Sequence, residues 1–188
     1  MVERNLEKKM NLPNRLTILR TILIIPFVII LLTGCFGSFS NWIALFIFIL
    51  ASITDLLDGK IARKYNLITN FGKFMDPLAD KLLVCSALIC LLSLERIPAW
   101  AVLIIMAREF IISGFRLVAT DNGVVIAASM WGKSKTVSQM ITIGILIADI
   151  DFILFEVLGI IGIYVSVILT IISLIDYIVK NKEVMKEK

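Results

Sequence analysis

Long apolar stretches separated by short polar segments dominate the pattern of this 188-residue chain. Each stretch has about the 20 residues that a helix needs to cross the hydrocarbon core of a bilayer. We predict six transmembrane helices, at Leu16–Thr33, Trp42–Arg63, Phe71–Leu94, Pro98–Thr120, Met130–Ala148 and Phe152–Val179. The connections are too short for a second domain. We therefore expect one all-α integral membrane domain (16–180), after a cytoplasmic or interfacial segment (1–15) and before a basic cytoplasmic tail (181–188).

Composition agrees with a membrane protein. Hydrophobic residues make up 59% of the chain, against about 45–50% in soluble domains, and the mean hydropathy is +0.96. The net charge of +4 reflects where the basic residues lie. Those expected on one side are Arg4, Lys8, Lys9, Arg15, Lys60, Arg63, Lys64, Lys73, Lys133, Lys135, Lys180, Lys182, Lys186 and Lys188. The opposite loops hold only Arg96, so the positive-inside rule predicts cytoplasmic termini and gives no reason to expect nucleic-acid binding.

The chain contains few of the residue types that commonly act in catalysis or bind zinc. The chain has no histidine, which removes the commonest general base and zinc ligand. Its cysteines, Cys35, Cys85 and Cys90, lie in or beside apolar stretches and lack the spacing of a metal site. We interpret them as apolar packing residues.

One stretch breaks the apolar pattern, "DLLDGKIARKYNLITNFGKFMDPLAD" at residues 55–80. Asp55 and Asp58 are spaced to share one face of the second predicted helix, and Asp76 and Asp80 one face of the third. A short connection makes these helices antiparallel neighbours, so the four carboxylates can converge. Such a group needs a compensating cation, and ligands with oxygen alone suit Mg²⁺ or Mn²⁺. Four aspartates suit two metal ions, the usual arrangement for phosphoryl transfer.

Two other interpretations fit the acids. The aspartates could be helix caps and surface ion pairs, or they could form the ion site of a divalent-cation transporter. Neither explains Arg63, whose planar guanidinium suits phosphate. Neither explains Gly59 and Gly72, which let a ligand approach the backbone closely.

These residues resemble the signature of the CDP-alcohol phosphotransferase family, D-x2-D-G-x2-A-R-x8-G-x3-D-x3-D. The chain has the required residue at every position: Asp55, Asp58, Gly59, Ala62, Arg63, Gly72, Asp76 and Asp80. The resemblance implies a membrane enzyme with six transmembrane helices, a polar active-site cavity at the cytoplasmic side, and a homodimeric assembly.

The resemblance also implies the reaction. An alcohol attacks the lipid-side phosphorus of CDP-diacylglycerol, and CMP leaves. Asp55, Asp58 and Asp76 would bind the metal ions, and Asp80 would be the general base while also touching a metal. The donor-binding residues would be Asp58, Gly59, Ala62, Arg63 and Gly72. Independently of the family, a carboxylate is the natural base in a chain without histidine.

Later cations bear on the identity of the alcohol. Arg108 and Arg116 lie on the fourth predicted helix, and Lys133 and Lys135 begin the fifth. The lysines could simply anchor the helix at the cytoplasmic surface. Arg108 lies well inside a span, so we expect it to pair with Glu109 or another acid. All four cations are candidates to bind a phosphate on the acceptor.

The segments that carry these cations, "REFIISGFR" and "GKSKT", resemble those of bacterial phosphatidylglycerophosphate synthases, as does "NLPNRLTILR" near the N-terminus. This resemblance implies that the acceptor is glycerol-3-phosphate. Another phosphorylated alcohol, such as inositol phosphate, is the alternative.

Overall fold

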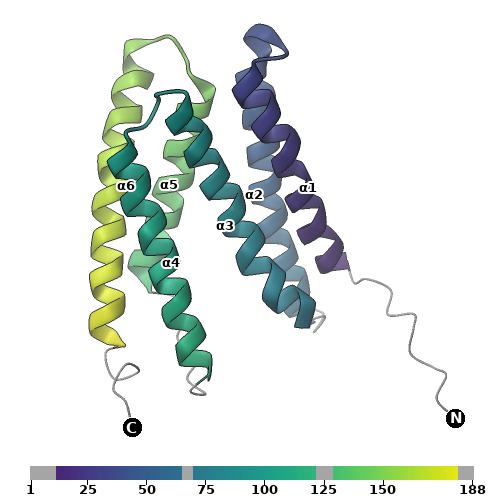
Figure 1. Cartoon of the computed structure of the whole chain (residues 1–188), viewed down its shortest axis with the longest axis vertical. Helices are drawn as coiled ribbons and strands as arrows, with labels where there is room; N and C mark the ends of the chain where they lie inside the picture. The colour runs from purple at the N-terminus through teal and green to yellow at the C-terminus, as the bar shows by residue number, and fades with distance from the viewer. Residues whose placement is uncertain (1–11, 65–69, 122–128, 182–188) are drawn as a thin grey trace, which may run out of the picture. The chain divides into compact units, whose positions relative to one another are not determined.

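The computed structural model describes residues 12–64, 70–121 and 129–181, and its elements there are helical (Figure 1). Side chains are described except at 12–15, 55–77, 80 and 120–121. The elements are α1 (Leu12–Thr33), η1 (Gly37–Phe39), α2 (Ser40–Lys64), α3 (Asn70–Ser93), α4 (Ala99–Asp121), α5 (Met130–Ala148) and α6 (Ile153–Lys180).

The structure confirms the prediction of six long helices. Helix α5 has the predicted bounds, and the largest difference is at α1, which begins at Leu12 rather than Leu16. The last residues assigned to the N-terminal segment are therefore helical, and residues 1–11 lie outside the described part. The short helix η1 was not predicted.

Three described segments are long and apolar enough to cross a membrane: Leu16–Thr33, Gly37–Thr54 and Ile153–Lys180. In α3 the apolar part is Lys81–Ser93, because the first half of the helix carries aspartates and lysines. Helices α4 and α5 also contain charged residues within their length. As spans, α3, α4 and α5 remain predictions.

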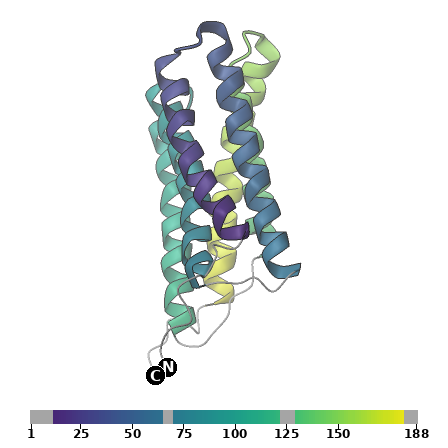
Figure 2. The ribbon, with the colours of Figure 1, turned by 90° about the vertical axis from the view of Figure 1, so that its right-hand side faces the viewer.

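The chain forms two compact units, Met1–Ser86 and Ala87–Lys188. In the first unit, α1 and α2 lie side by side (Figure 2). Phe27 and Phe48 meet in their shared core with ring centroids 6.0 Å apart, and both side chains are buried. Helix α2 ends and α3 begins within this unit, so the unit contains the whole aspartate-rich stretch.

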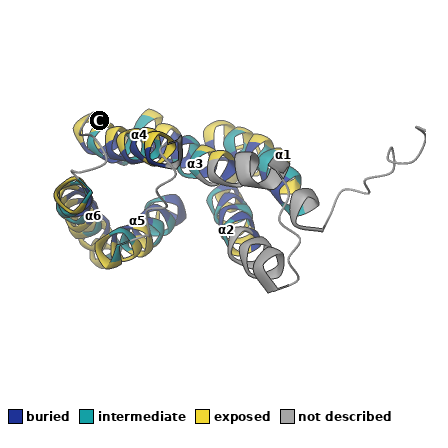
Figure 3. Ribbon diagram, turned by 90° about the horizontal axis from the view of Figure 1, so that it is seen from below, coloured by how far each residue is buried: buried dark blue, intermediate teal, exposed yellow. Residues whose placement is uncertain are grey.

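In the second unit, α6 packs against both α4 and α5. Each of these helices has one buried and one exposed face (Figure 3). Hydroxyl groups line the α5–α6 contact, where Thr142 Oγ1 and Ser166 Oγ are 3.1 Å apart. A Cβ on Gly162 would lie 2.6 Å from Thr142 Oγ1. Close approach through small and hydroxyl residues is typical of helix pairs in membranes.

Arg96, the only basic residue expected on the outer side, stabilises the end of α5. Its guanidinium donates to the carbonyl oxygens of Leu146 and Ile147 at 3.2 and 3.3 Å and forms an ion pair with Asp149 at 2.5 Å. Asp149 ends the helix with a left-handed backbone conformation, φ 47°. Arg96 therefore supplies the positive charge and the donors that a helix C-terminus favours.

Candidate active site

The signature aspartates lie on two helices of the first unit. Asp55 and Asp58 belong to the last turns of α2, and Asp76 and Asp80 to the first turns of α3. Because both helices are continuous through these positions, each pair shares one helix face, as the sequence predicted. The four aspartates thus lie as two pairs on consecutive helices, which are separated by five residues.

The side chains of this aspartate site lie outside the described residues. The same holds for the other predicted donor-binding positions, Gly59, Ala62, Arg63 and Gly72. Their helical placement is confirmed, and their roles stay predictions.

The same unit contains a buried arginine that the sequence analysis did not single out. Arg20 lies in α1 and is 0% exposed, as is Thr17 one turn earlier. A charged side chain buried within an apolar helix is unfavourable, so such residues usually pair with another group or serve the function. The signal was available in the sequence, because Arg20 interrupts an apolar segment.

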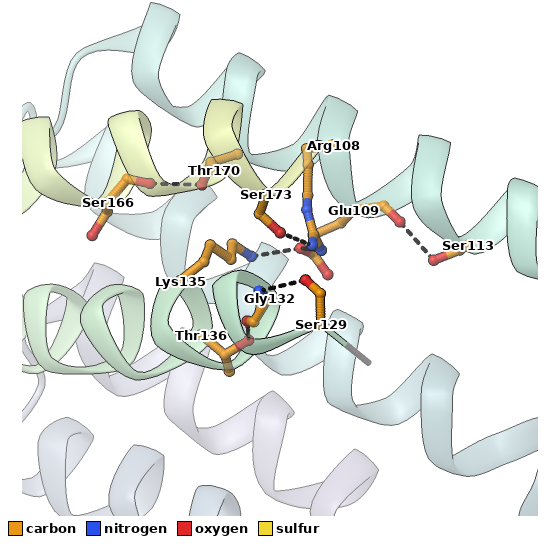
Figure 4. Close-up of polar contacts among 10 residues, drawn as sticks. All are labelled: Arg108, Glu109, Ser113, Ser129, Gly132, Lys135, Thr136, Ser166, Thr170 and Ser173. Atoms are coloured by element: carbon orange, nitrogen blue, oxygen red, sulfur yellow. Dashed lines mark hydrogen bonds and ion pairs between the residues drawn. The ribbon is translucent and has the colours of Figure 1, made fainter. Parts of the chain in front are cut away.

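In the second unit, three charged side chains form a buried ion-pair cluster, Arg108, Glu109 and Lys135 (Figure 4). Arg108 Nη1 donates to Glu109 Oε1 at 3.0 Å, and Lys135 Nζ donates to the same oxygen at 2.5 Å. The exposed fractions of the Arg108, Glu109 and Lys135 side chains are 10%, 18% and 3%. The expected pairing of Arg108 with Glu109 is confirmed, and α4 is fastened to α5 through one carboxylate.

Helix α6 supports this cluster from a third side. Arg108 Nη2 donates to Ser173 Oγ at 2.6 Å (Figure 4). Gly132 lies beside this contact, since a Cβ there would be 3.5 Å from Arg108 Nη2 and 3.7 Å from Ser173 Oγ. Ser129 caps the start of α5 by accepting from the Gly132 amide at 3.1 Å. The guanidinium therefore lies against the first turn of α5, with α4 and α6 each binding one of its terminal nitrogens.

The remaining predicted acceptor residues are exposed. Arg116 lies two turns after Arg108 on α4, and its guanidinium carbon is 5.8 Å from the ring centroid of Tyr177 on α6. Lys133 is exposed, whereas Lys135 is buried, because residues two apart on a helix face different directions. The structure thus joins Arg108 to Lys135, pairs Arg116 with an aromatic ring and leaves Lys133 on an outer face.

The ion-pair cluster combines two cations with one carboxylate. Its three side chains carry a net charge of +1 in a largely buried place, where a charge acts more strongly than in water. The buried Nε of Arg108 has no hydrogen-bond partner in the described part of the chain. A fixed positive charge with a donor to spare favours an anion, and phosphate is the anion that arginine binds best.

Comparisons with known proteins identify the family. Residues 10–172 match the CDP-alcohol phosphatidyltransferase family. The chain belongs to this family. It is 43% identical to the CDP-diacylglycerol–glycerol-3-phosphate 3-phosphatidyltransferase of Bacillus subtilis strain 168, with 94% of this chain and 97% of the relative covered. It is 44% identical to the protein of that name from Rickettsia typhi, with 89% and 94% covered. A probable phosphatidylglycerophosphate synthase of Mycobacterium tuberculosis strain H37Rv is 38% identical, with 90% and 81% covered.

Membership in the CDP-alcohol phosphatidyltransferase family confirms the resemblance read from the aspartate signature and favours an enzyme over a cation transporter. Two residues beside the cations escaped the sequence analysis, Ser173 and Tyr177. Both lie in α6, for which the hydrophobicity pattern predicted a transmembrane helix and no functional residue. The spacing of the polar residues in α6 could have revealed them, because it places Ser166, Thr170, Ser173 and Tyr177 on one face of the helix. This face is buried.

Proposed function

We propose that this chain transfers the phosphatidyl group of CDP-diacylglycerol to glycerol-3-phosphate, giving phosphatidylglycerophosphate and CMP. The acceptor oxygen bonds to the lipid-side phosphorus, the bond from that phosphorus to CMP breaks, and the acceptor's hydroxyl proton is removed. The observation that carries the proposal is the complete aspartate signature on α2 and α3 of a chain that also carries a buried cation cluster. The names of the similar enzymes support this choice of substrates.

On the donor side, Asp55, Asp58, Asp76 and Asp80 would bind Mg²⁺ or Mn²⁺, with two ions matching four carboxylates. Bound divalent ions would neutralise the phosphate oxygens and favour charge development on the departing CMP. Asp58 with Gly59, Ala62, Arg63 and Gly72 would line the CDP site. Arg63 would hold a phosphate by its planar fork, while the glycines permit close approach of the nucleotide.

Asp80 would remove the acceptor's hydroxyl proton. It is the last of the four aspartates along the chain and the second of the two on α3. A carboxylate within hydrogen-bond reach of the hydroxyl can accept that proton as the new bond forms.

The acceptor's phosphate would bind to Arg116, Lys133 and Lys135, with Arg108 contributing through the ion-pair cluster. These cations would bind the phosphate oxygens through charge-assisted hydrogen bonds, which are stronger than those between neutral groups. Lys135 is held by Glu109 in the structure, so the carboxylate fixes the ammonium in place. The same pocket would accept inositol phosphate, which is the alternative acceptor.

The cytoplasmic side of the cell membrane is the expected location of the site and of both termini. The basic residues concentrate at that end, and three segments have the length and apolar character of spans. We expect the enzyme to act as a homodimer, as implied by its family.

Removal of an acceptor cation tests the pocket. We expect Arg116→Ala and Lys135→Ala each to raise the KM for glycerol-3-phosphate by about 10–150-fold, because a hydrogen bond to a charged group contributes roughly 1.5–3 kcal/mol. The KM for CDP-diacylglycerol should stay constant. Both constants are measured with purified protein in detergent micelles.

Lys180→Ala is the matched control. Lys180 ends α6, pairs with Asp176 and has a side chain 62% exposed, so its loss should leave both KM values unchanged. A normal acceptor KM in both Arg116→Ala and Lys135→Ala would show that these cations only anchor helices, and the choice of a phosphorylated acceptor would then lose its physical basis.

A further inference from the structure

We propose that Ser173 and Tyr177 of α6 are positioning residues, which orient the two arginines of α4 for the acceptor's phosphate. The inference rests on the proposed function and deepens it, because it assigns acceptor affinity in part to a helix that contributes no charge to the pocket. Ser173 and Tyr177 are one helical turn apart, and both are buried, at 0% and 2% exposed.

Ser173 fixes the plane of the Arg108 guanidinium. An arginine side chain has several rotatable bonds and loses affinity for a ligand if it must be ordered on binding. Here Nη1 is bound by Glu109 from α4 and Nη2 by Ser173 from α6, at 3.0 and 2.6 Å. These contacts occupy the two terminal nitrogens. The remaining donor is Nε, which has no hydrogen-bond partner among the described residues.

Tyr177 supports Arg116 through its ring. The guanidinium carbon lies 5.8 Å from the ring centroid, within the range of a cation–π interaction. Such a contact uses the face of the guanidinium and orients its plane, and a cation–π interaction does not consume the in-plane N–H groups. The ring itself is held edge-on against Phe115, at 5.6 Å and an interplanar angle of 85°.

The tyrosine hydroxyl adds nothing to this support. Tyr177 OH is buried without a hydrogen-bond partner in the described structure, and a buried unpaired hydroxyl is unfavourable. The ring is therefore the part of Tyr177 that acts on Arg116. Removing the hydroxyl alone therefore separates this proposal from one in which Tyr177 binds the ligand through its oxygen.

The test uses Ser173→Ala and Tyr177→Leu in the full-length enzyme. We expect Ser173→Ala to raise the KM for glycerol-3-phosphate about three- to tenfold, because part of a charged hydrogen bond is lost to the pocket. Tyr177→Leu should raise it about two- to fivefold, the range of an exposed cation–π contact. The kcat and the KM for CDP-diacylglycerol should not change in either variant.

Two further variants serve as controls. Tyr177→Phe keeps the ring and should restore the wild-type KM. Thr170→Val removes another buried hydroxyl from the same face of α6, one that donates its proton to the Ser166 carbonyl at 2.6 Å. It should also leave the acceptor KM unchanged. If Tyr177→Leu does not fold, Ser173→Ala, which removes a single oxygen atom, decides alone.

Arg116→Ala, measured alongside, separates the two proposals. A raised acceptor KM in Arg116→Ala with an unchanged one in Ser173→Ala and Tyr177→Leu would overturn the positioning role and leave the proposed function intact. A lower kcat together with a raised KM for both substrates in the α6 variants would also overturn the positioning role, since general packing damage has that effect. An unchanged KM in Arg116→Ala itself would count against the acceptor pocket.

Discussion

Asparagine in place of Asp55, Asp58 or Asp76 is expected to reduce turnover nearly to background. Asparagine keeps the size of the side chain and removes its charge, so a hard divalent ion loses one of its anionic ligands. The remaining aspartates should not compensate, because neighbouring carboxylates repel one another unless a cation neutralises them. Initial rates of CMP release at saturating CDP-diacylglycerol and glycerol-3-phosphate measure the effect.

Chelation should reproduce this loss without any mutation. EDTA should silence the unmodified enzyme, and added Mg²⁺ or Mn²⁺ should restore it. Asp151→Asn is a suitable control, since Asp151 is an exposed carboxylate in the loop between α5 and α6, and it should retain full activity. Full turnover in EDTA would refute the metal site.

Asp80→Asn is expected to lower kcat by about 10²–10⁴, the contribution of a well-placed general base. Asparagine cannot accept the proton, while the other aspartates still hold the donor. The affinity for CDP-diacylglycerol should therefore survive, as measured by binding of the donor or of CMP in the presence of Mg²⁺. The residual rate should rise with pH, because hydroxide can replace the missing base.

The opposite pattern would reassign Asp80. A variant with normal kcat and a much larger KM for CDP-diacylglycerol would limit Asp80 to binding the metal or the donor, and another group would have to accept the proton.

Hydrophobicity predicted the helices well, because each helix contains a long apolar part, although charged residues occur within α1, α3, α4 and α5. α5 was predicted to the residue, since Ser129 is a good N-cap and Asp149 ends the helix. The error at α1 arose because Leu12–Arg15 is polar enough to read as a surface segment, although its backbone is helical.

The candidate site was predictable to the extent that it is local in sequence. Asp55 to Asp80 form one signature within 26 residues, so spacing alone placed each pair on one face of its helix; the convergence of the two pairs stays a prediction. The contacts of Arg108 were only half predictable. Glu109 is adjacent in the chain, whereas Ser173 is 65 residues away, and no periodicity within α4 reveals which hydroxyl of α6 it meets.

Two lysines that look equivalent in the sequence differ in burial in the structure. Lys133 and Lys135 looked equivalent as basic residues at a helix start, yet one is exposed and the other is 2% exposed and paired with Glu109. The pairing depends on where α4 and α5 each pack against α6, which is set by side-chain packing between helices rather than by any local pattern.

The most direct test of the account is to identify the lipid product. Purified enzyme is incubated with CDP-diacylglycerol, Mg²⁺ or Mn²⁺, and one of four acceptors: glycerol-3-phosphate, inositol phosphate, glycerol or inositol. We expect phosphatidylglycerophosphate and CMP in equal amounts with glycerol-3-phosphate, and little product with the unphosphorylated alcohols. Efficient use of glycerol or inositol, or no lipid product with glycerol-3-phosphate in the presence of metal, would contradict it.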